Sequence, residues 1–373
     1  MARAPALQDI EAVPESDRLE GFAHPRETKQ CFGHESAERE LAGALNRGQV
    51  HHAWLLTGPP GIGKATLAYR FAKCLLAAPQ ERRVDSGSLE VAASSQASRQ
   101  VQVLSHPGLL VLRRPYDLKA KRFTASIPVD EVRRLRSFLG HRAAEGNWRV
   151  VIVDSADDLN INAANALLKS LEEPPRRMVF LLVSAEPGRL LNTIRSRCRR
   201  LDIGALQRKE LMAAVEQAYA GSDEDPPADD IAGRLAQLAQ GSVRRFIALH
   251  SAGGIEIHEK IGKVFSRLPA VDWGSAHDLA ESLGGAAASE RYTLYQELLF
   301  DELARIIKAA ATGLGGEVAV ELGGRLIRPD RLASWAALWE TLVREEAETR
   351  ALNLDRKAFI LGTLQRIEAA ARH

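Results

Sequence analysis

Short runs of consecutive hydrophobic residues alternate with amphipathic stretches up to about residue 204 of this 373-residue chain. A short continuous apolar run indicates a buried strand, and apolar residues at intervals of three and four indicate a helix. The predicted strands are residues 53–57, 106–112, 150–153 and 179–183, and the predicted helices are residues 35–47, 65–77, 129–139 and 162–173. This alternation predicts an α/β fold with a parallel sheet covered by helices on both faces.

Beyond residue 204 the hydrophobic pattern is helical throughout, whereas the first 24 residues are polar and show no periodicity. Residues 79–105 hold little apolar material, and we predict a surface loop or insertion there. The pattern divides the chain into four predicted parts. They are a flexible tail (1–24), an α/β domain (25–204), a small helical domain (205–255) and an all-helical domain (256–373).

Composition narrows the function classes. The net charge is +2, so no global field attracts nucleic acid, and any basic surface must be local. No apolar run approaches the ~18 residues that span a bilayer, and the acidic N-terminus does not resemble a signal peptide. The three cysteines, Cys31, Cys74 and Cys198, are far apart, which predicts neither disulfides nor a metal site. We therefore expect no membrane association and a reducing cytoplasm.

A glycine-rich loop, Gly58-Pro59-Pro60-Gly61-Ile62-Gly63-Lys64, lies between a predicted strand and a predicted helix. In this context Gly58, Gly61, Gly63 and Lys64 are typical of a phosphate-binding loop. The pattern requires a hydroxyl after the lysine to bind Mg²⁺, but this position is Ala65. Thr66 comes one residue later, about 100° further around a helix.

A second position also departs from an active ATPase. Asp154 ends the strand at 150–153, as a metal-binding carboxylate would, but Ser155 follows where such an ATPase carries its catalytic glutamate. Because positioning and electrostatics supply nearly all of phosphoryl-transfer catalysis, these losses predict very weak hydrolysis. Two alternatives remain open for the loop. It binds ATP or ADP without turnover, or it is vestigial and only packs.

The most specific segment is Asn162–Pro175, which contains Asn-Ala-Leu-Leu-Lys-Ser-Leu-Glu-Glu-Pro-Pro. Together with the glycine loop, Ser196-Arg197-Cys198 and Gly241-Ser242-Val243-Arg244, it resembles the clamp-loader branch of the AAA+ ATPases. The resemblance covers about residues 25–250. It implies a AAA+ P-loop domain followed by a helical lid domain, and the remaining helices fit the collar domain of that family by pattern only.

The resemblance also implies roles for individual residues. Arg197 matches the arginine that reaches across a subunit boundary to the γ-phosphate of a neighbour, a role that suits a permanently charged guanidinium. Ser184 matches the first sensor position and Arg244 the second. Many relatives carry a four-cysteine zinc module, but the corresponding interval here contains only Cys74, so we predict no zinc.

The implied function is that of a non-motor subunit of the bacterial DNA polymerase III clamp loader. Such a subunit has no independent catalysis and assists ATP-dependent loading of the sliding clamp onto primed DNA. The implied partners are the gamma/tau and delta subunits of a ring, and indirectly the clamp and DNA. The alternative is an active gamma/tau-like motor ATPase, against which Ala65 and Ser155 argue. Local basic clusters, among them Lys119 and Lys121-Arg122, are either a solvated face or phosphate contacts.

Overall fold

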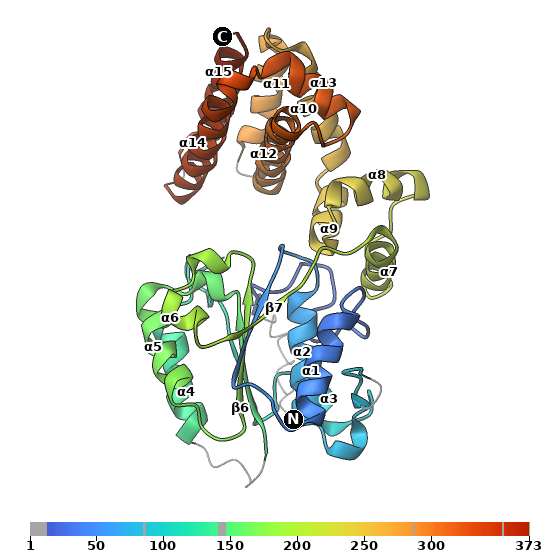
Figure 1. Ribbon diagram of the computed structural model, residues 1–373, viewed down its shortest axis with the longest axis vertical. Helices are drawn as coiled ribbons and strands as arrows, with labels where there is room; N and C mark the ends of the chain where they lie inside the picture. Colours follow the sequence, from blue (N-terminus) through green and yellow to red (C-terminus); the bar gives the residue numbers. More distant parts are fainter. Residues whose placement is uncertain (1–12, 85–86, 141–146, 286–287, 353, 373) are drawn as a thin grey trace, which may run out of the picture. The chain divides into compact units, whose positions relative to one another are not determined.

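The computed structural model describes residues 13–84, 87–140, 147–285, 288–352 and 354–372, and it divides into two compact units (Figure 1). Unit 1 comprises the described residues up to Ala228 together with Ala239–Arg245. Unit 2 comprises Asp229–Leu238 and the described residues from Phe246 onward. The predicted four-part division is finer than these two units, and its boundaries stay a prediction.

Unit 1 is built on a five-stranded sheet in the order β2-β5-β6-β1-β7, with all neighbouring strands parallel. Its strands are β1 (Ala53–Thr57), β2 (Leu109–Leu112), β5 (Arg149–Asp154), β6 (Met178–Ser184) and β7 (Arg199–Asp202). The predicted parallel α/β sheet is confirmed. The edge strand β7 was not predicted, because Leu201 is its one buried residue and no hydrophobic run marks it.

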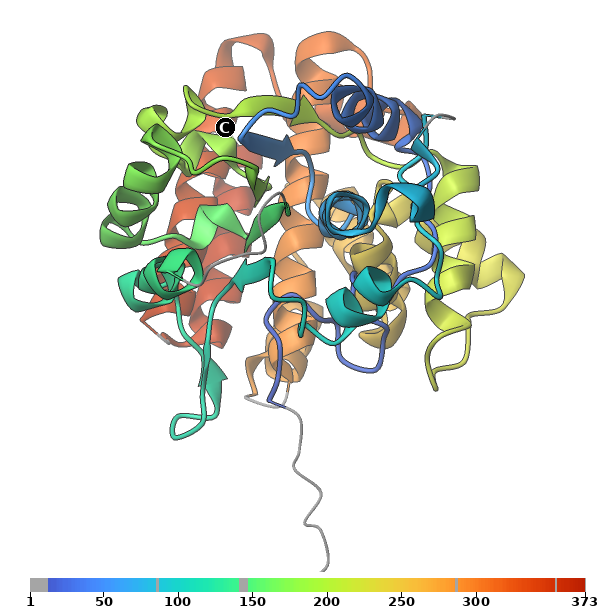
Figure 2. The same cartoon turned by 90° about the horizontal axis from the view of Figure 1, so that it is seen from below.

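Helices cover both faces of this sheet (Figures 1 and 2). Helices α1 (Glu35–Asn46), α2 (Lys64–Leu76) and α3 (Gln96–Gln102) lie on one side, and α4 (Val129–Gly140), α5 (Ile161–Glu172) and α6 (Asn192–Arg195) on the other. Successive strand residues point to opposite faces, so Trp54 packs in the first layer and Leu55 in the second. Helix α7 (Arg208–Tyr219) completes unit 1.

Residues 79–105, predicted to be a surface loop or insertion, are partly helical in the structure. The described part of this segment contains a short turn, Pro79–Glu81, and the helix α3. Leu89 and Val101 are buried in the layer formed by α1 and α2, whereas Val103 is 72% exposed. Because the segment contains few apolar residues, its hydrophobic pattern did not show that part of it packs against the core.

The predicted flexible tail also differs from the structure over residues 13–24. Asp17 and Glu15 are held in ion pairs with arginines, and His24 is fully buried. Hydrophobic periodicity does not detect a segment that is anchored by charges. The tail prediction for residues 1–12 lies outside the described residues.

Unit 2 is helical in all its described elements, as predicted for this part of the chain. These are α8 (Asp229–Ala239), α9 (Val243–Ser251), α10 (Gly254–Arg267), α11 (Trp273–Gly284), α12 (Ser289–Thr312), α13 (Glu317–Leu326), α14 (Leu332–Ala351) and α15 (Arg356–Arg372). The long helix α12 packs against α10, α11, α13 and α14. Its contact with α13 is close, because a Cβ on Gly323 would lie 2.9 Å from the Ala310 nitrogen. None of the described helices is long and apolar enough to cross a membrane.

Candidate functional site

The glycine loop connects the end of β1 to the first residue of α2. Gly58, Gly61 and Gly63 have φ angles of 148°, 74° and 105°, which side chains rarely tolerate. A Cβ on Gly58 would lie 2.1 Å from the carbonyl oxygen of Ile203, so this glycine is also required for packing. The loop therefore has the backbone path that places N–H groups and the N-terminus of α2 where a phosphate binds.

Lys64 is the first residue of α2 and is buried, with 5% of its surface exposed. Its Nζ donates hydrogen bonds to the carbonyl oxygens of Gly58 (2.6 Å) and Pro59 (2.5 Å). Burial lowers the pKa of Lys64 to about 8, and the nearby Asp154 opposes this shift. A desolvated ammonium group at a helix N-terminus favours the approach of an anion.

The segment Ser242–Arg244 packs directly on the loop. The carbonyl oxygen of Gly61 accepts hydrogen bonds from the backbone N–H groups of Val243 (3.0 Å) and Arg244 (3.5 Å). A Cβ on Gly61 would lie 2.4 Å from the Ser242 hydroxyl oxygen. The structure thus places Arg244, which is 183 residues after Gly61, beside the glycine loop.

Asp154 lies at the end of β5 and is 8% exposed. Burial, with a smaller contribution from Asp17, raises the pKa of Asp154 to about 7, even though Lys64 and Arg244 act to lower it. The carboxyl group is therefore partly protonated near neutral pH, which weakens it as a ligand for Mg²⁺. Ala65 and Ser155 add no carboxylate or magnesium-binding hydroxyl at their motif positions, and Thr66 is half-buried in the first turn of α2.

This set of groups fits the phosphates of a nucleotide but not a magnesium-dependent hydrolytic centre. The loop, Lys64 and Arg244 supply N–H groups and positive charge for phosphate oxygens. ATP or ADP, if held there, would supply the phosphates, and these residues would bind and orient them. Among the described residues no group of three or more His, Cys, Asp or Glu side chains could hold a metal ion.

Ser184, the predicted first sensor, is fully buried at the end of β6. Its hydroxyl donates to Oδ1 of Asp157 at 2.5 Å. The other oxygen of Asp157 accepts from the N–H groups of Ala185 (2.6 Å) and Glu186 (3.1 Å). Asp157 therefore closes the turn after β6 and holds the hydroxyl of Ser184 in a fixed orientation.

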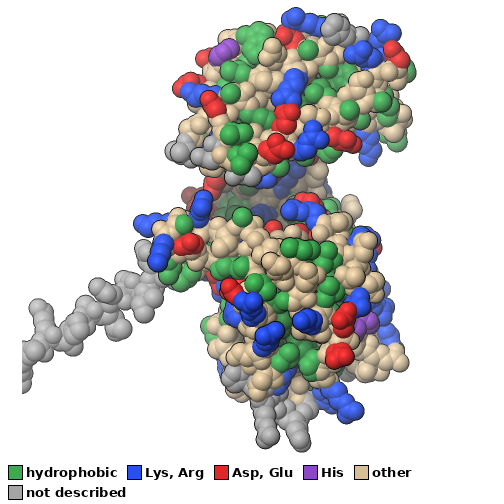
Figure 3. Space-filling model, turned by 90° about the vertical axis from the view of Figure 1, so that its left-hand side faces the viewer, with side chains coloured by type: hydrophobic (Ala, Val, Ile, Leu, Met, Phe, Trp, Pro, Cys, Tyr) green, Lys and Arg blue, Asp and Glu red, His purple; other side chains and the backbone are tan. Residues whose placement is uncertain are grey.

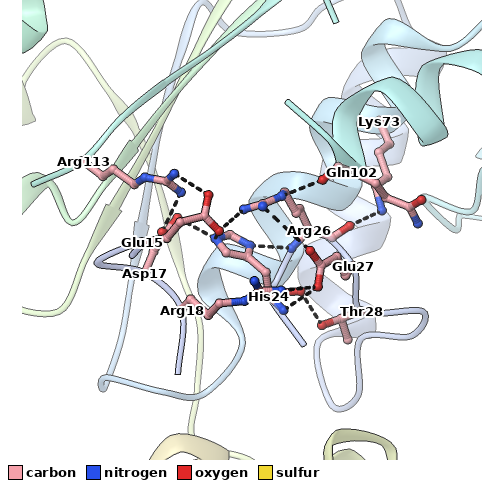
Figure 4. Close-up of polar contacts among 10 residues, drawn as sticks. All are labelled: Glu15, Asp17, Arg18, His24, Arg26, Glu27, Thr28, Lys73, Gln102 and Arg113. Carbon is pink, nitrogen blue, oxygen red and sulfur yellow. Dashed lines mark hydrogen bonds and ion pairs between the residues drawn. The ribbon is translucent and has the colours of Figure 1, made fainter. Parts of the chain in front are cut away.

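Figure 4 shows an ion-pair network that sequence reasoning missed. Two of its members, Asp17 and Arg113, act on the pKa of Asp154. Arg113, directly after β2, pairs with Asp17 (2.7 Å) and Glu15 (2.5 Å). His24 Nδ1 accepts from the Arg26 N–H, so Nε2 carries the proton that faces Asp17 at 3.0 Å. The signal in the sequence was the run of acidic residues before position 20.

Arg197 follows α6 and lies apart from these contacts. Its guanidinium donates to the carbonyl oxygen of Thr193 (3.0 Å) and pairs with Glu172 at 2.9 Å, and 35% of the side chain is exposed. Glu172 is the last residue of α5, within the Glu-Glu-Pro-Pro segment. Two motifs that are separate in the sequence thus meet in one exposed ion pair.

A cavity of about 430 Å³ lies beside Arg197 and was not predicted. It is lined by Leu55, Pro187, Asn192, Arg195, Ser196 and Arg200. Ser196 directly precedes Arg197 in the sequence, but Arg197 itself does not line the cavity.

Three features define a AAA+-type P-loop fold. They are the strand order, the glycine loop after β1 and Asp154 at the end of β5. Residues 33–207 match the family described as "DNA polymerase III, delta subunit". The DNA polymerase III subunit delta′ of Pseudomonas aeruginosa is 41% identical over 152 residues, covering 41% of this chain and 43% of that protein. The corresponding Escherichia coli subunit is 29% identical over 339 residues, covering 88% of this chain and 92% of that protein.

The chain is therefore a homologue of DNA polymerase III delta′ subunits, and the resemblance to the clamp-loader branch of the AAA+ ATPases is confirmed. Among solved structures, a DNA polymerase III gamma-subunit-related protein from Thermotoga maritima aligns with 91% of this chain and 99% of its own. That alignment has 17% identity and a TM-score of 0.40. At this score the fold assignment rests on the strand order and the sequence matches.

Proposed function

We propose that this chain is the non-motor delta′ subunit of a bacterial clamp loader and assists ATP-dependent loading of the sliding clamp onto primed DNA. The observation that carries the proposal is a contrast between two sites. The chain's own nucleotide loop lacks the hydroxyl at Ala65 and the carboxylate at Ser155, whereas Arg197 is exposed on the surface. A subunit of this kind contributes to hydrolysis at a neighbour's site and not at its own.

In this role Arg197 is an arginine finger in trans. It would leave Glu172 and stabilise the negative charge that develops on a phosphoryl group bound to the adjacent ATPase. The exposed Arg197–Glu172 pair is weak, since surface ion pairs contribute about 0–1 kcal/mol. Arg197 therefore loses little free energy when it leaves Glu172 to bind a phosphate.

The glycine loop, with Gly58, Gly61, Gly63, Lys64 and Arg244, would bind ATP or ADP weakly and without turnover. Asp154, Thr66 and Ser184 would line this site without completing a magnesium centre, and no zinc is involved. The partners would be the gamma/tau and delta subunits of a cytoplasmic ring, and through them the clamp and primed DNA.

The test is ATP hydrolysis by the full-length chain, alone and assembled with its motor subunits, clamp and primed DNA. We expect the chain alone to be inert and Arg197→Ala to reduce turnover at the site it faces by about 10³-fold, the usual contribution of such a finger. Arg189→Ala is the matched control, because Arg189 is also exposed and pairs with Glu186 at the surface. Normal turnover by the assembled Arg197→Ala complex would contradict the proposal.

A second candidate is an active motor ATPase, favoured by similarity to DNA polymerase III subunit tau/gamma of Haemophilus influenzae. That protein is 29% identical over 226 residues, covering 60% of this chain and 30% of its own length. The two candidates differ in the isolated chain. Hydrolysis by the chain alone that is abolished by Lys64→Ala would replace the first proposal with the second.

A further inference from the structure

A short β-hairpin extends from unit 1 and takes no part in the sites described above (Figure 2). Its strands are β3 (Tyr116–Asp117) and β4 (Arg122–Phe123), with Tyr116 opposite Phe123 and Asp117 opposite Arg122. Residues 118–121 form the tip. In Figure 2 the hairpin projects away from the sheet and its helices.

The hairpin is held in one conformation by local contacts. Asp117 Oδ1 accepts hydrogen bonds from the backbone N–H groups of Lys119 (2.8 Å) and Ala120 (3.0 Å), which fixes the turn. The rings of Tyr116 and Phe123 meet edge to face, with centroids 5.2 Å apart. A two-stranded ribbon alone is marginally stable, so these contacts order the tip before any partner arrives.

The base of the hairpin is anchored by ion pairs. Arg113 is held by Asp17 and Glu15, and Arg114 pairs with Asp158 at 3.1 Å. The arginines at the base are therefore neutralised within unit 1, and the free positive charge of this segment is at the tip.

The tip combines exposed cations with an exposed apolar side chain. Lys119, Lys121 and Arg122 are exposed, and within the described chain no carboxylate lies within ion-pair distance of either lysine. Leu118, directly before Lys119, is 70% exposed. At the end of an ordered, projecting hairpin, these cations and Leu118 are accessible to a partner together.

We propose that this hairpin is a nucleic-acid-binding arm whose lysines contact backbone phosphates and whose Leu118 contacts sugars or bases. A two-stranded ribbon fits the major groove of duplex DNA, and leucine side chains serve as apolar contacts or wedges in minor-groove binders. Lysine provides a flexible point charge suited to phosphate oxygens without base specificity. The assignment of primed DNA as the nucleic acid rests on the proposed function; the phosphate contact does not.

The test measures binding of the full-length chain to a fluorescent primer–template DNA as a function of salt concentration. Each phosphate contact contributes about 0.9 to the slope of log K against log salt. We expect Lys119→Ala/Lys121→Ala to reduce the magnitude of this slope by about 1.8 and to weaken binding roughly 50-fold at 0.1 M salt. Leu118→Ser should weaken binding severalfold and leave the slope unchanged, because it removes no charge.

The matched control is Arg208→Ala/Lys209→Ala in the first turn of α7, which removes the same charge from another exposed surface. An equal loss in the control and hairpin variants would overturn the proposal in favour of a general charge effect. Unchanged DNA binding in the hairpin variant would also overturn it. The proposal would also be overturned if the hairpin variant failed to assemble with the other subunits but still bound DNA. The partner of the hairpin would then be an acidic protein surface.

This experiment is separable from the test of the proposed function. DNA binding by the isolated full-length chain requires neither the motor subunits nor Arg197. Suppose that Arg197→Ala leaves turnover unchanged while the hairpin variant has a smaller slope of log K against log salt. The proposed role in the clamp loader is then wrong, and the proposal that the hairpin binds nucleic acid is still supported.

Discussion

Individual residues of the glycine loop were predictable, because the motif is local in sequence. Gly58, Gly61, Gly63 and Lys64 lie within one loop, so their spacing alone places them together. The state of Asp154 was not predictable, because its neighbour Asp17 comes from a segment 137 positions earlier that hydrophobic patterns do not detect. The sequence motifs therefore identified these side chains, whereas their protonation states follow only from the folded structure.

Asp154→Asn tests that charge state. The pKa of Asp154 is about 7 in the folded chain against 3.8 for the free side chain. The folded state therefore binds more protons between these values, and its stability falls as the pH rises from about 4 to 7. The variant does not lose this stability, so its free energy of unfolding should exceed that of the wild type increasingly toward pH 8, by on the order of 4 kcal/mol at most.

The measurement is urea unfolding of both proteins at pH 5, 6, 7 and 8. Asp130→Asn is the control, because that carboxylate is 77% exposed. The prediction fails if the difference between Asp154→Asn and wild type does not change with pH.

Among the elements, those with a hydrophobic signature were predicted well. The strand at 150–153 and the helix at 162–173 appear as β5 and α5 with small shifts in their ends. The edge strand β7 and the helix α3 were missed, since each buries few apolar side chains. The N-terminal segment was misassigned for another reason, which is that ion pairs hold it in place.

The anchoring of that segment predicts a large difference between two adjacent arginines. Arg113 bonds to Asp17, which is 4% exposed, and to Glu15, which is 13% exposed. Removing Arg113 leaves Asp17 with only His24 and Glu15 with only Arg26 and His24 as partners, so Arg113→Met should cost on the order of 3 kcal/mol of stability. Arg114 pairs with a more exposed acid, Asp158, and Arg114→Met should cost less than about 1 kcal/mol.

Chemical unfolding of the two variants at pH 7 measures these losses of stability. Because Arg113 and Arg114 are adjacent, each variant controls for the effect of a substitution on the local backbone. Equal costs would mean that burial does not distinguish the two ion pairs. A larger cost for Arg114→Met would show that the N-terminal segment is not held through Arg113.

For the whole molecule, the sequence predicted an α/β part followed by a helical part, and both are present in the described residues. The path of the chain between them was not predicted. It enters unit 2 at Asp229, returns to unit 1 for Ala239–Arg245 and leaves again. No local pattern encodes that return, because it depends on contacts with the glycine loop, which lies far earlier in the sequence.

Acidic and basic side chains are interspersed on the face that Figure 3 shows, so this face has no dominant electrostatic field.

The return segment predicts how fragments of the chain behave. Leu206 N–H donates to the Gly241 carbonyl oxygen at 3.2 Å, and Val243 N–H donates to Gly61 at 3.0 Å. Two such bonds contribute about 1–3 kcal/mol, and for a unit of this size each kcal/mol shifts the melting temperature by about 2–4 °C. A fragment of residues 1–245 should therefore melt several degrees above a fragment of residues 1–228.

Thermal unfolding followed by circular dichroism makes the comparison, with Gly241→Ala in the longer fragment as the matched variant. Gly241 has a φ angle of 79°, and a Cβ there would lie 2.6 Å from the Leu206 carbonyl oxygen, so the substitution should remove the gain. If the two fragments melt together, the return segment does not stabilise unit 1. If they differ and Gly241→Ala abolishes the difference, the glycine loop is stabilised by a segment that follows the whole sheet in sequence, and unit 1 reaches its full stability only when the chain extends through Arg245.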